Sequence, residues 1–199
     1  MKKIILMVTV LLVGFLIYSC SCLSCDSKEQ ANVPLDILEK ADSFIVSKTG
    51  EKFLKTYITT DFFRTKHTAP NYEMVYRLYI PEKSYVDALI KFTVDSVGNV
   101  VKNREIIGIP NCRFYPQECA FNIDEQAARQ IATKNGLEEG IKEWIVGFIW
   151  NAKYDKYVWH ILSTLEEMEG EFGYRAMGKE AIIDPSNGEV IALNDWNIM

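Results

Sequence analysis

The sequence predicts a mixed α+β protein in which a helix followed by antiparallel strands occurs twice in tandem. Two observations predict this fold. Apolar residues at helical spacing precede segments in which apolar and polar residues alternate, and the same order recurs about 90 residues later. The composition agrees with it, since 48% hydrophobic and 25% charged residues are typical of an ordinary globular protein.

The N-terminal residues have the pattern of a secretory signal peptide. Two lysines precede an apolar run, residues 4–18, that is shorter than the about 20 residues of helix needed to cross a membrane. Ser19 stands directly before Cys20, an arrangement that resembles the lipobox of bacterial lipoproteins. The resemblance implies cleavage before Cys20 and a lipid on its thiol. Cys22 and Cys25 are alternative lipidation sites, and an uncleaved anchor or a plain secreted protein is the competing interpretation.

A polar segment follows the predicted signal peptide, which comprises residues 1–19. Residues 20–33 contain few apolar side chains, so we expect a flexible tether there. A lipid at the start of the tether would hold the folded part at the bacterial cell envelope, facing the periplasm or the cell surface.

The first helix-plus-sheet unit is predicted over residues 34–108. Its helix, residues 34–48, begins at a proline, whose backbone angle suits a first turn, and stops at Gly50. We expect three strands after it, at residues 52–65, 72–80 and 86–94. In the last of these strands apolar and polar residues alternate, and the turn 95–99 leads into a return strand at Val100.

The second unit is predicted over residues 121–199. Asn122 or Asp124 caps its helix, which ends at the Asn-Gly pair 135–136. Strands follow at residues 143–152, 156–164, 179–183 and 189–193. The turn 184–188 repeats the first unit's turn, because an Asp ends the strand, a glycine occupies the turn and β-branched residues follow. The repeated order predicts two units with the same architecture.

Residues 109–120 form the predicted linker between the units, and they contain Cys112 and Cys119. In an oxidising compartment these cysteines can close a short disulfide ring that contributes roughly 2 kcal/mol to stability. Free thiols are the second interpretation. A redox pair or a metal clamp is the third, although it requires a Cys-x-x-Cys spacing or further ligands, which this sequence does not offer.

The second unit resembles the PepSY and PepSY-like domains of bacterial secreted proteins and protease propeptides. The resemblance rests on the helix at 123–132, the strand Tyr-Val-Trp-His-Ile at 157–161 and the hairpin at 181–191. It implies a cystatin-like fold, a helix laid on a curled antiparallel sheet, and it extends to the first unit through the internal repeat. It also implies a non-enzymatic domain that inhibits or modulates a peptidase. Small immunity proteins of bacterial toxin systems show a similar order of elements and form the alternative resemblance.

The sequence offers little chemistry for catalysis. Signatures of nucleophile elbows, zinc proteases and nucleotide-binding loops do not occur in it. We expect His67 to lie in an exposed loop and His160 on a sheet surface rather than at a ligand site. The acidic run 166–171 lacks the regular oxygen donors of a calcium loop, so we expect a solvated loop there. Aromatic residues are dense in the second unit, but a register error of one residue would exchange their faces.

These observations together predict a lipid-anchored protein-binding module without enzymatic activity, metal or cofactor. The expected partner is a secreted or envelope protein such as a peptidase, or a toxin if the immunity resemblance holds. Nucleic acid is not an expected partner, because 27 acidic residues outnumber 22 basic ones. An envelope hydrolase with an unrecognised site and a structural spacer of the envelope are the remaining alternatives.

Overall fold

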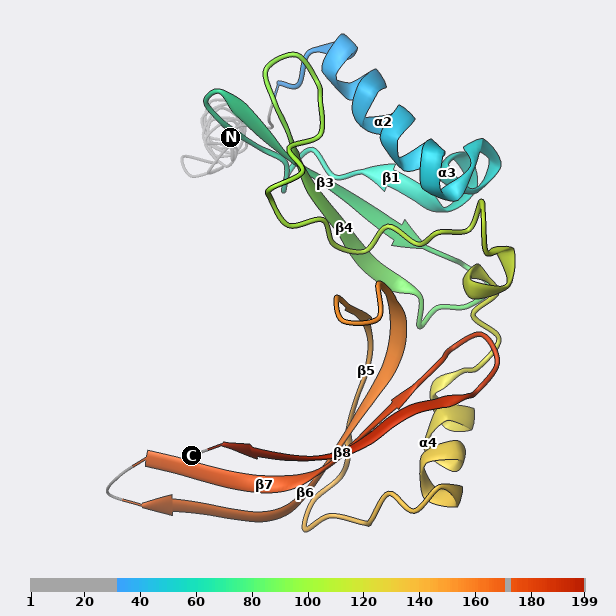
Figure 1. The fold of residues 1–199 in the computed structure, drawn as a ribbon, viewed down its shortest axis with the longest axis vertical. Coiled ribbons are helices and arrows are strands. Elements are labelled where there is room, and N and C mark those ends of the chain that lie inside the picture. Colours follow the sequence, from blue (N-terminus) through green and yellow to red (C-terminus); the bar gives the residue numbers. More distant parts are fainter. Residues whose placement is uncertain (1–31, 171–172, 199) are drawn as a thin grey trace, which may run out of the picture. The chain divides into compact units, whose positions relative to one another are not determined.

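The computed structural model describes residues 32–170 and 173–198 (Figure 1). Within these residues the fold is mixed α+β, with two antiparallel sheets of four strands each. No helix in the described part of the chain is both long and apolar enough to span a bilayer. The predicted signal peptide and the lipidation candidates Cys20, Cys22 and Cys25 lie outside the described residues.

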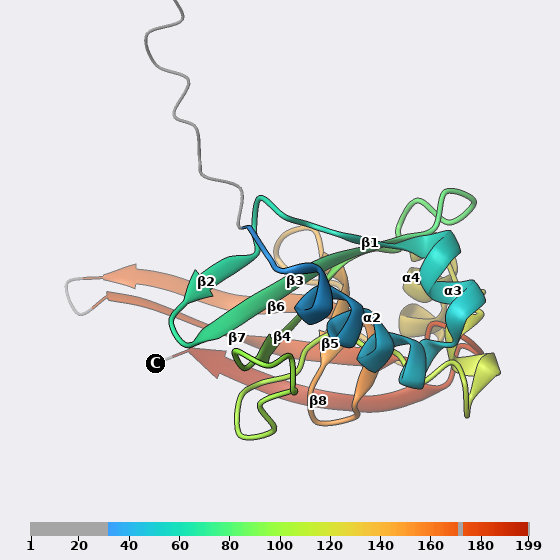
Figure 2. The ribbon, with the colours of Figure 1, turned by 90° about the horizontal axis from the view of Figure 1, so that it is seen from above.

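Helix α2, Leu35–Thr49, confirms the first predicted helix. Ile37, Ala41 and Ile45 are its buried apolar residues, and their spacing of four places them on one face. That face packs on the first sheet against residues of β3 and β4. Figure 2 shows α2 lying across these strands.

The strand predicted at residues 52–65 is wrong in its first half. Residues Glu51–Tyr57 form a second helix, α3, and only Ile58–Thr60 form a strand, β1. Gly50 has a φ of 84°, so the chain turns there and begins a new helix instead of a strand. Phe53, Leu54 and Tyr57 pack against the first core, and their helical spacing accounts for the departure from the predicted strand.

The first sheet has β3, Asn71–Tyr79, at its centre. β4, Asp87–Val94, pairs with one edge of β3, and β1 and β2, Lys66–Thr68, pair with the other. The predicted alternation of β4 is confirmed, because Ile90, Phe92 and Val94 are buried while Lys91 is exposed. The return strand predicted at Val100 is reduced to two isolated bridges, one from Val94 to Val100 and one from Lys91 to Ile107.

Helix α4, Glu125–Lys134, and a four-stranded meander make up the second half of the fold. The side chain of Asp124 accepts a hydrogen bond of 2.8 Å from the backbone N–H of Ala127, so Asp124 is the N-cap. The strands are β5 (Ile145–Asn151), β6 (Lys156–Gly170), β7 (Gly173–Ile183) and β8 (Val190–Ile198). They pair antiparallel in chain order.

The acidic loop predicted at residues 166–171 is wrong where the structure describes it. Residues 166–170 continue strand β6 and pair with residues 173–177 of β7 after a register shift between Thr164 and Glu166. The backbone hydrogen bonds of this pairing need no buried side chains, so exposed glutamates are compatible with a strand here.

The apolar interior consists of two buried clusters that are joined by residues packing against both. One buried cluster lies between α2 and the first sheet, and it includes Tyr157 of the second sheet. The other lies between α4 and the second sheet. Tyr85 and Phe148 pack against both clusters, and Phe121 stacks edge-on against Phe148 at 5.4 Å between ring centroids. The hydroxyl of Tyr157 also donates a hydrogen bond of 2.9 Å to the carbonyl of Gly108.

Candidate protein-binding surface

Strand β8 forms one edge of the second sheet. It pairs with β7 and with no other strand among the described residues. Every other backbone N–H and C=O of an edge strand points away from its partner, so β8 presents a row of unpaired hydrogen-bonding groups. Its nine residues contain a single charge, at Asp195, and no lysine, proline or glycine. β8 therefore lacks the residues with which proteins commonly block pairing at a sheet edge.

Two side chains on one face of the sheet, Asn194 and Trp196, hold β8 in place. Trp196 Nε1 donates hydrogen bonds of 3.2 and 3.1 Å to the carbonyls of Ser163 and Lys179, and its ring lies over Gly178. Asn194 Nδ2 donates one of 2.9 Å to Glu180 Oε1. These contacts fix the strand before any partner arrives, which lowers the entropy cost of binding at its edge.

The strands continue beyond the cover of α4 (Figure 1). α4 packs on Trp159, Ile161, Ala181 and Ile183, whereas apolar residues nearer the far end of the strands are exposed. A shallow cleft of about 690 Å³ lies there. Its apolar lining residues are Ile141, Leu165, Met168, Ala176, Met177 and Ile198. Met168 is 65% exposed and Ile198 is 51% exposed, so this end of the sheet offers apolar surface beside the free edge.

Charged residues lie at the margin of this apolar end. Glu167 accepts hydrogen bonds from Lys142 and from the hydroxyl of Tyr174, and these bonds lower the pKa of Glu167. Outside the lining of the cleft, Glu138 accepts a hydrogen bond from Lys179, and this bond raises the pKa of Lys179. Lys142 balances the charge of Glu167, and Glu166 and Arg175 add one charge of each sign to the lining, so the cleft carries little net charge.

The loop predicted for His67 is wrong, because Lys66–Thr68 form the exposed strand β2, whereas the sheet position predicted for His160 is confirmed. His67 stacks on Tyr72 in the first sheet, with 4.3 Å between ring centroids. His160 Nε2 lies 2.6 Å from Glu180 Oε2 on the second sheet. Burial by itself would raise the pKa of Glu180, but hydrogen bonds from Asn194 and His160 lower it. In residues 32–170 and 173–198 no group of three or more His, Cys, Asp or Glu side chains is placed to hold a metal.

A partly buried ion pair between Lys156 and Asp184 fixes the last hairpin. Lys156 Nζ lies 2.8 Å from Asp184 Oδ2 and 3.4 Å from Glu118 Oε1. The backbone N–H of Ser186 donates a hydrogen bond of 2.8 Å to Asp184 Oδ1. Burial acts to raise the pKa of Asp184, but the hydrogen bonds from Lys156 and Ser186 outweigh it and lower that pKa. These contacts indicate that Asp184, at the end of its strand, has a structural role.

Cys112 and Cys119 are joined by a disulfide in the structure, with 5.4 Å between their Cα atoms. The bridge closes the loop that ends in the short helix η1, Pro116–Cys119. Cys112 is buried, and Cys119 packs against the first core. The bridge thereby ties the predicted linker to the interior rather than leaving it exposed.

Comparisons of the chain with protein-family models, with curated proteins and with solved structures find no match. Sequence reasoning missed most of the surface described above, because the predicted strands end at residues 164 and 193. The alternation of the apolar residues Trp196 and Ile198 is the pattern in the sequence that could have predicted the observed end of β8.

Proposed function

We propose that this protein is a non-enzymatic binding module that pairs β8 with an extended segment of a secreted or envelope protein. A peptidase is the partner class implied by the PepSY resemblance. The observation that carries the proposal is the free edge of β8, nine residues long with a single charge. Such an edge accepts an added strand through main-chain hydrogen bonds, which is a recurrent mode of peptide recognition.

The neighbouring apolar end supplies specificity in this proposal. An added strand would direct alternate side chains to the two faces of the sheet. On one face they would meet Leu193 and Met177, which are exposed, and on the other Ile198. Main-chain pairing would provide affinity for many segments, while these apolar side chains would favour a partner with apolar residues at alternate positions.

The repeated order of elements supports two tandem cystatin-like units, the second PepSY-like, as the scaffold of the module. A helix, α2 or α4, precedes an antiparallel meander in each half of the fold. In the first half β1, β3 and β4 follow in order, and the bridges of residues 100 and 107 stand where a fourth strand would lie. A lipid at Cys20 would raise the local concentration of the module at the bacterial envelope, where it would face the periplasm or the cell surface.

The test compares the chain lacking residues 1–19 with a Leu193→Lys variant in pull-downs from the secreted and envelope fractions of the source cells. A lysine on the edge strand should hinder strand addition, so we expect at least a tenfold lower yield of the specific partner. Leu35→Lys, at an exposed position of α2, is the matched control and should leave the yield unchanged.

Hydrogen exchange on the purified pair then locates the contact. Strand addition should protect backbone amides of β8 that exchange freely in the unbound protein. Equal capture by the wild type and Leu193→Lys, or protection confined to other elements, would contradict the proposed binding mode. A captured partner without peptidase activity would contradict the proposed partner class but not the proposed pairing with the edge of β8.

A further inference from the structure

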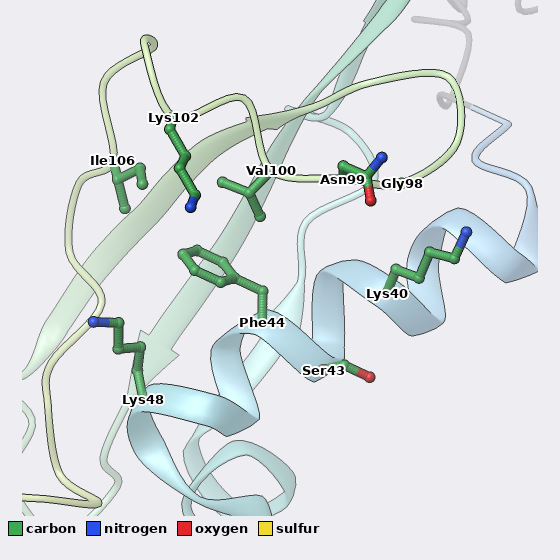
Figure 3. A pocket seen from close by; sticks show the side chains of 9 residues that line it. All are labelled: Lys40, Ser43, Phe44, Lys48, Gly98, Asn99, Val100, Lys102 and Ile106. Carbon is green, nitrogen blue, oxygen red and sulfur yellow. The ribbon is translucent and has the colours of Figure 1, made fainter.

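A groove of about 770 Å³ lies between α2 and the segment 98–106 (Figure 3). Its lining residues are Lys40, Ser43, Phe44, Lys48, Gly98, Asn99, Val100, Lys102 and Ile106. Three of these are lysines and none is acidic, although acidic residues outnumber basic ones in the whole chain. The lining thus has a local charge opposite to that of the protein.

The helix wall of the groove alternates charge and apolar surface. Lys40, Phe44 and Lys48 are four residues apart, so they form one row along α2. With a rise of about 1.5 Å per residue, the row is about 12 Å long between the outer Cα atoms. The ring of Phe44 packs edge-on against Phe92 at 5.2 Å and is only partly buried, and in Figure 3 it faces Val100.

The three lysines differ in their bonding. Lys40 Nζ donates a hydrogen bond to the carbonyl of Val97, and its stem lies against Gly98, so Lys40 holds the turn in place. Lys48 and Lys102 take part in none of the ion pairs among residues 32–170 and 173–198. Lys48 and Lys102, on opposite walls, are therefore available to an incoming anion, and the ammonium group of Lys40 has further N–H donors besides the one that binds Val97.

We propose that this groove binds an extended peptide segment in which two carboxylates flank one apolar side chain, in the pattern acidic-x-apolar-x-acidic. In an extended chain residues i, i+2 and i+4 face the same side. At about 3.3 Å per residue, the two acidic residues lie about 13 Å apart, which matches the spacing of the Lys40–Phe44–Lys48 row. One carboxylate meets Lys40 and the other meets Lys48 and Lys102, while the apolar side chain meets Phe44, Val100 and Ile106.

The geometry favours a peptide over a single compact anion. A phosphate or a carboxylate alone is too small to contact lysines about 12 Å apart along the helix, and it would leave the apolar floor uncovered. The groove is formed by residues of α2 and of the segment after β4, so it is separate from the β8 edge and goes beyond the function proposed above.

The test measures fluorescence anisotropy of two labelled peptides of identical composition on the chain lacking residues 1–19. The first is Ser-Glu-Ser-Leu-Ser-Glu-Ser, which places both glutamates and the leucine on one side of an extended chain. The second is Ser-Ser-Glu-Leu-Glu-Ser-Ser, which places the glutamates opposite the leucine. We expect the first peptide to bind at least about fivefold more tightly than the second. Its affinity should fall when salt is raised from about 0.05 to about 0.5 M, because salt screens exposed ion pairs.

Substitutions then locate the site. Lys48→Gln and Lys102→Gln should each weaken binding of the first peptide about twofold to fivefold, because each removes one exposed ion pair. Lys134→Gln, in the last turn of α4, is the matched control and should leave binding unchanged. Circular dichroism of each variant shows whether the fold is kept, and all three positions are exposed, so we expect it to be.

Several outcomes would overturn the proposal. Equal affinity for the two peptides would contradict the proposed acidic-x-apolar-x-acidic pattern. Equal affinity of Lys48→Gln and the wild type for the first peptide would show that the peptide binds elsewhere. Binding of phosphatidylglycerol vesicles that depends on Lys48 and Lys102, without peptide binding, would assign the groove to lipid headgroups. Self-association that is lost in Lys48→Gln, again without peptide binding, would assign it to a second copy of this chain.

Discussion

Asp184 shows how a single residue of the repeated turn acts in the folded protein. The sequence predicts an Asp at the end of the strand, and the structure shows that its carboxylate is buried and bound by Lys156 and the N–H of Ser186. These donors lower its pKa in the folded state below the ordinary value of 3.8, although burial opposes them. Its ionised form therefore stabilises the fold.

The stability of the protein should depend on the ionisation of Asp184. Because the pKa of Asp184 is lowered by folding, its contribution is complete above pH 3.8 and is lost as the pH falls through the lower folded value. Asp184→Asn should reduce the free energy of unfolding at pH 7. The difference in unfolding free energy between this variant and the wild type should shrink below about pH 4, because protonation of Asp184 removes its contribution in the wild type as well. Urea unfolding between pH 7 and pH 2 measures this.

The control for this prediction is Asp155→Asn, at an exposed turn residue with a φ of 50° that asparagine also tolerates. It should keep the pH dependence of the wild type. A difference between Asp184→Asn and the wild type that stays constant from pH 7 to pH 2 would contradict the assigned role of the carboxylate.

At the scale of elements, Gly178 lets three strands come together. A Cβ atom built on Gly178 would lie 1.9 Å from the carbonyl oxygen of Ser163 in β6 and 3.0 Å from the ring of Trp196 in β8. Any side chain here would push β7 away from both neighbours. The position of Trp196, and with it the observed course of β8, therefore depends on a glycine in the middle of β7.

Gly178→Ala should destabilise the protein. The added methyl group forces a shift of backbone atoms, and we expect a cost of about 1–3 kcal/mol in the free energy of unfolding. Gly170→Ala is the control, because a Cβ at Gly170 in β6 meets no atom within 4 Å. Urea unfolding of both variants measures the difference. Equal stability of the two would show that the strands adjust without cost.

The elements differ in how well the sequence predicts them. α2, α4, β3 and β4 follow from helical or alternating patterns, because each buries one face against a core. α3 was not predicted, since its apolar residues also suit a strand. The strands of the second sheet extend well beyond their predicted ends, because strand pairing continues past the point where α4 covers the sheet. The candidate binding edge of β8 includes this extended part of the strand, which the periodicity of the sequence did not predict.

At the scale of the whole molecule, the two halves are not independent bodies on a linker. Residues 31–199 form one compact unit, and Tyr85 and Phe148 pack against both apolar clusters. Tyr85 also donates a hydrogen bond to the carbonyl of Phe121, which lies between the predicted linker and the second helix. Disruption of either core thus removes contacts from the other.

The described part of the chain should therefore unfold in one cooperative transition. All four tryptophans lie in residues 144–196, so their fluorescence reports the second half, whereas far-ultraviolet circular dichroism reports both. The two signals should give the same urea midpoint, and Phe148→Ala should lower both together by an amount corresponding to about 3 kcal/mol. Two separate midpoints, or a Phe148→Ala effect limited to fluorescence, would show that the halves unfold independently.

The sequence by itself determined the α+β class, two of the helices and the central strands, because those features depend on local periodicity, capping residues and turn glycines. Only the tertiary structure decided the length of β8, the exposure of its edge and the meeting of α2 with the segment 98–106. These features depend on contacts between residues far apart in the chain, which local patterns do not encode. Both proposed binding sites arise from such contacts.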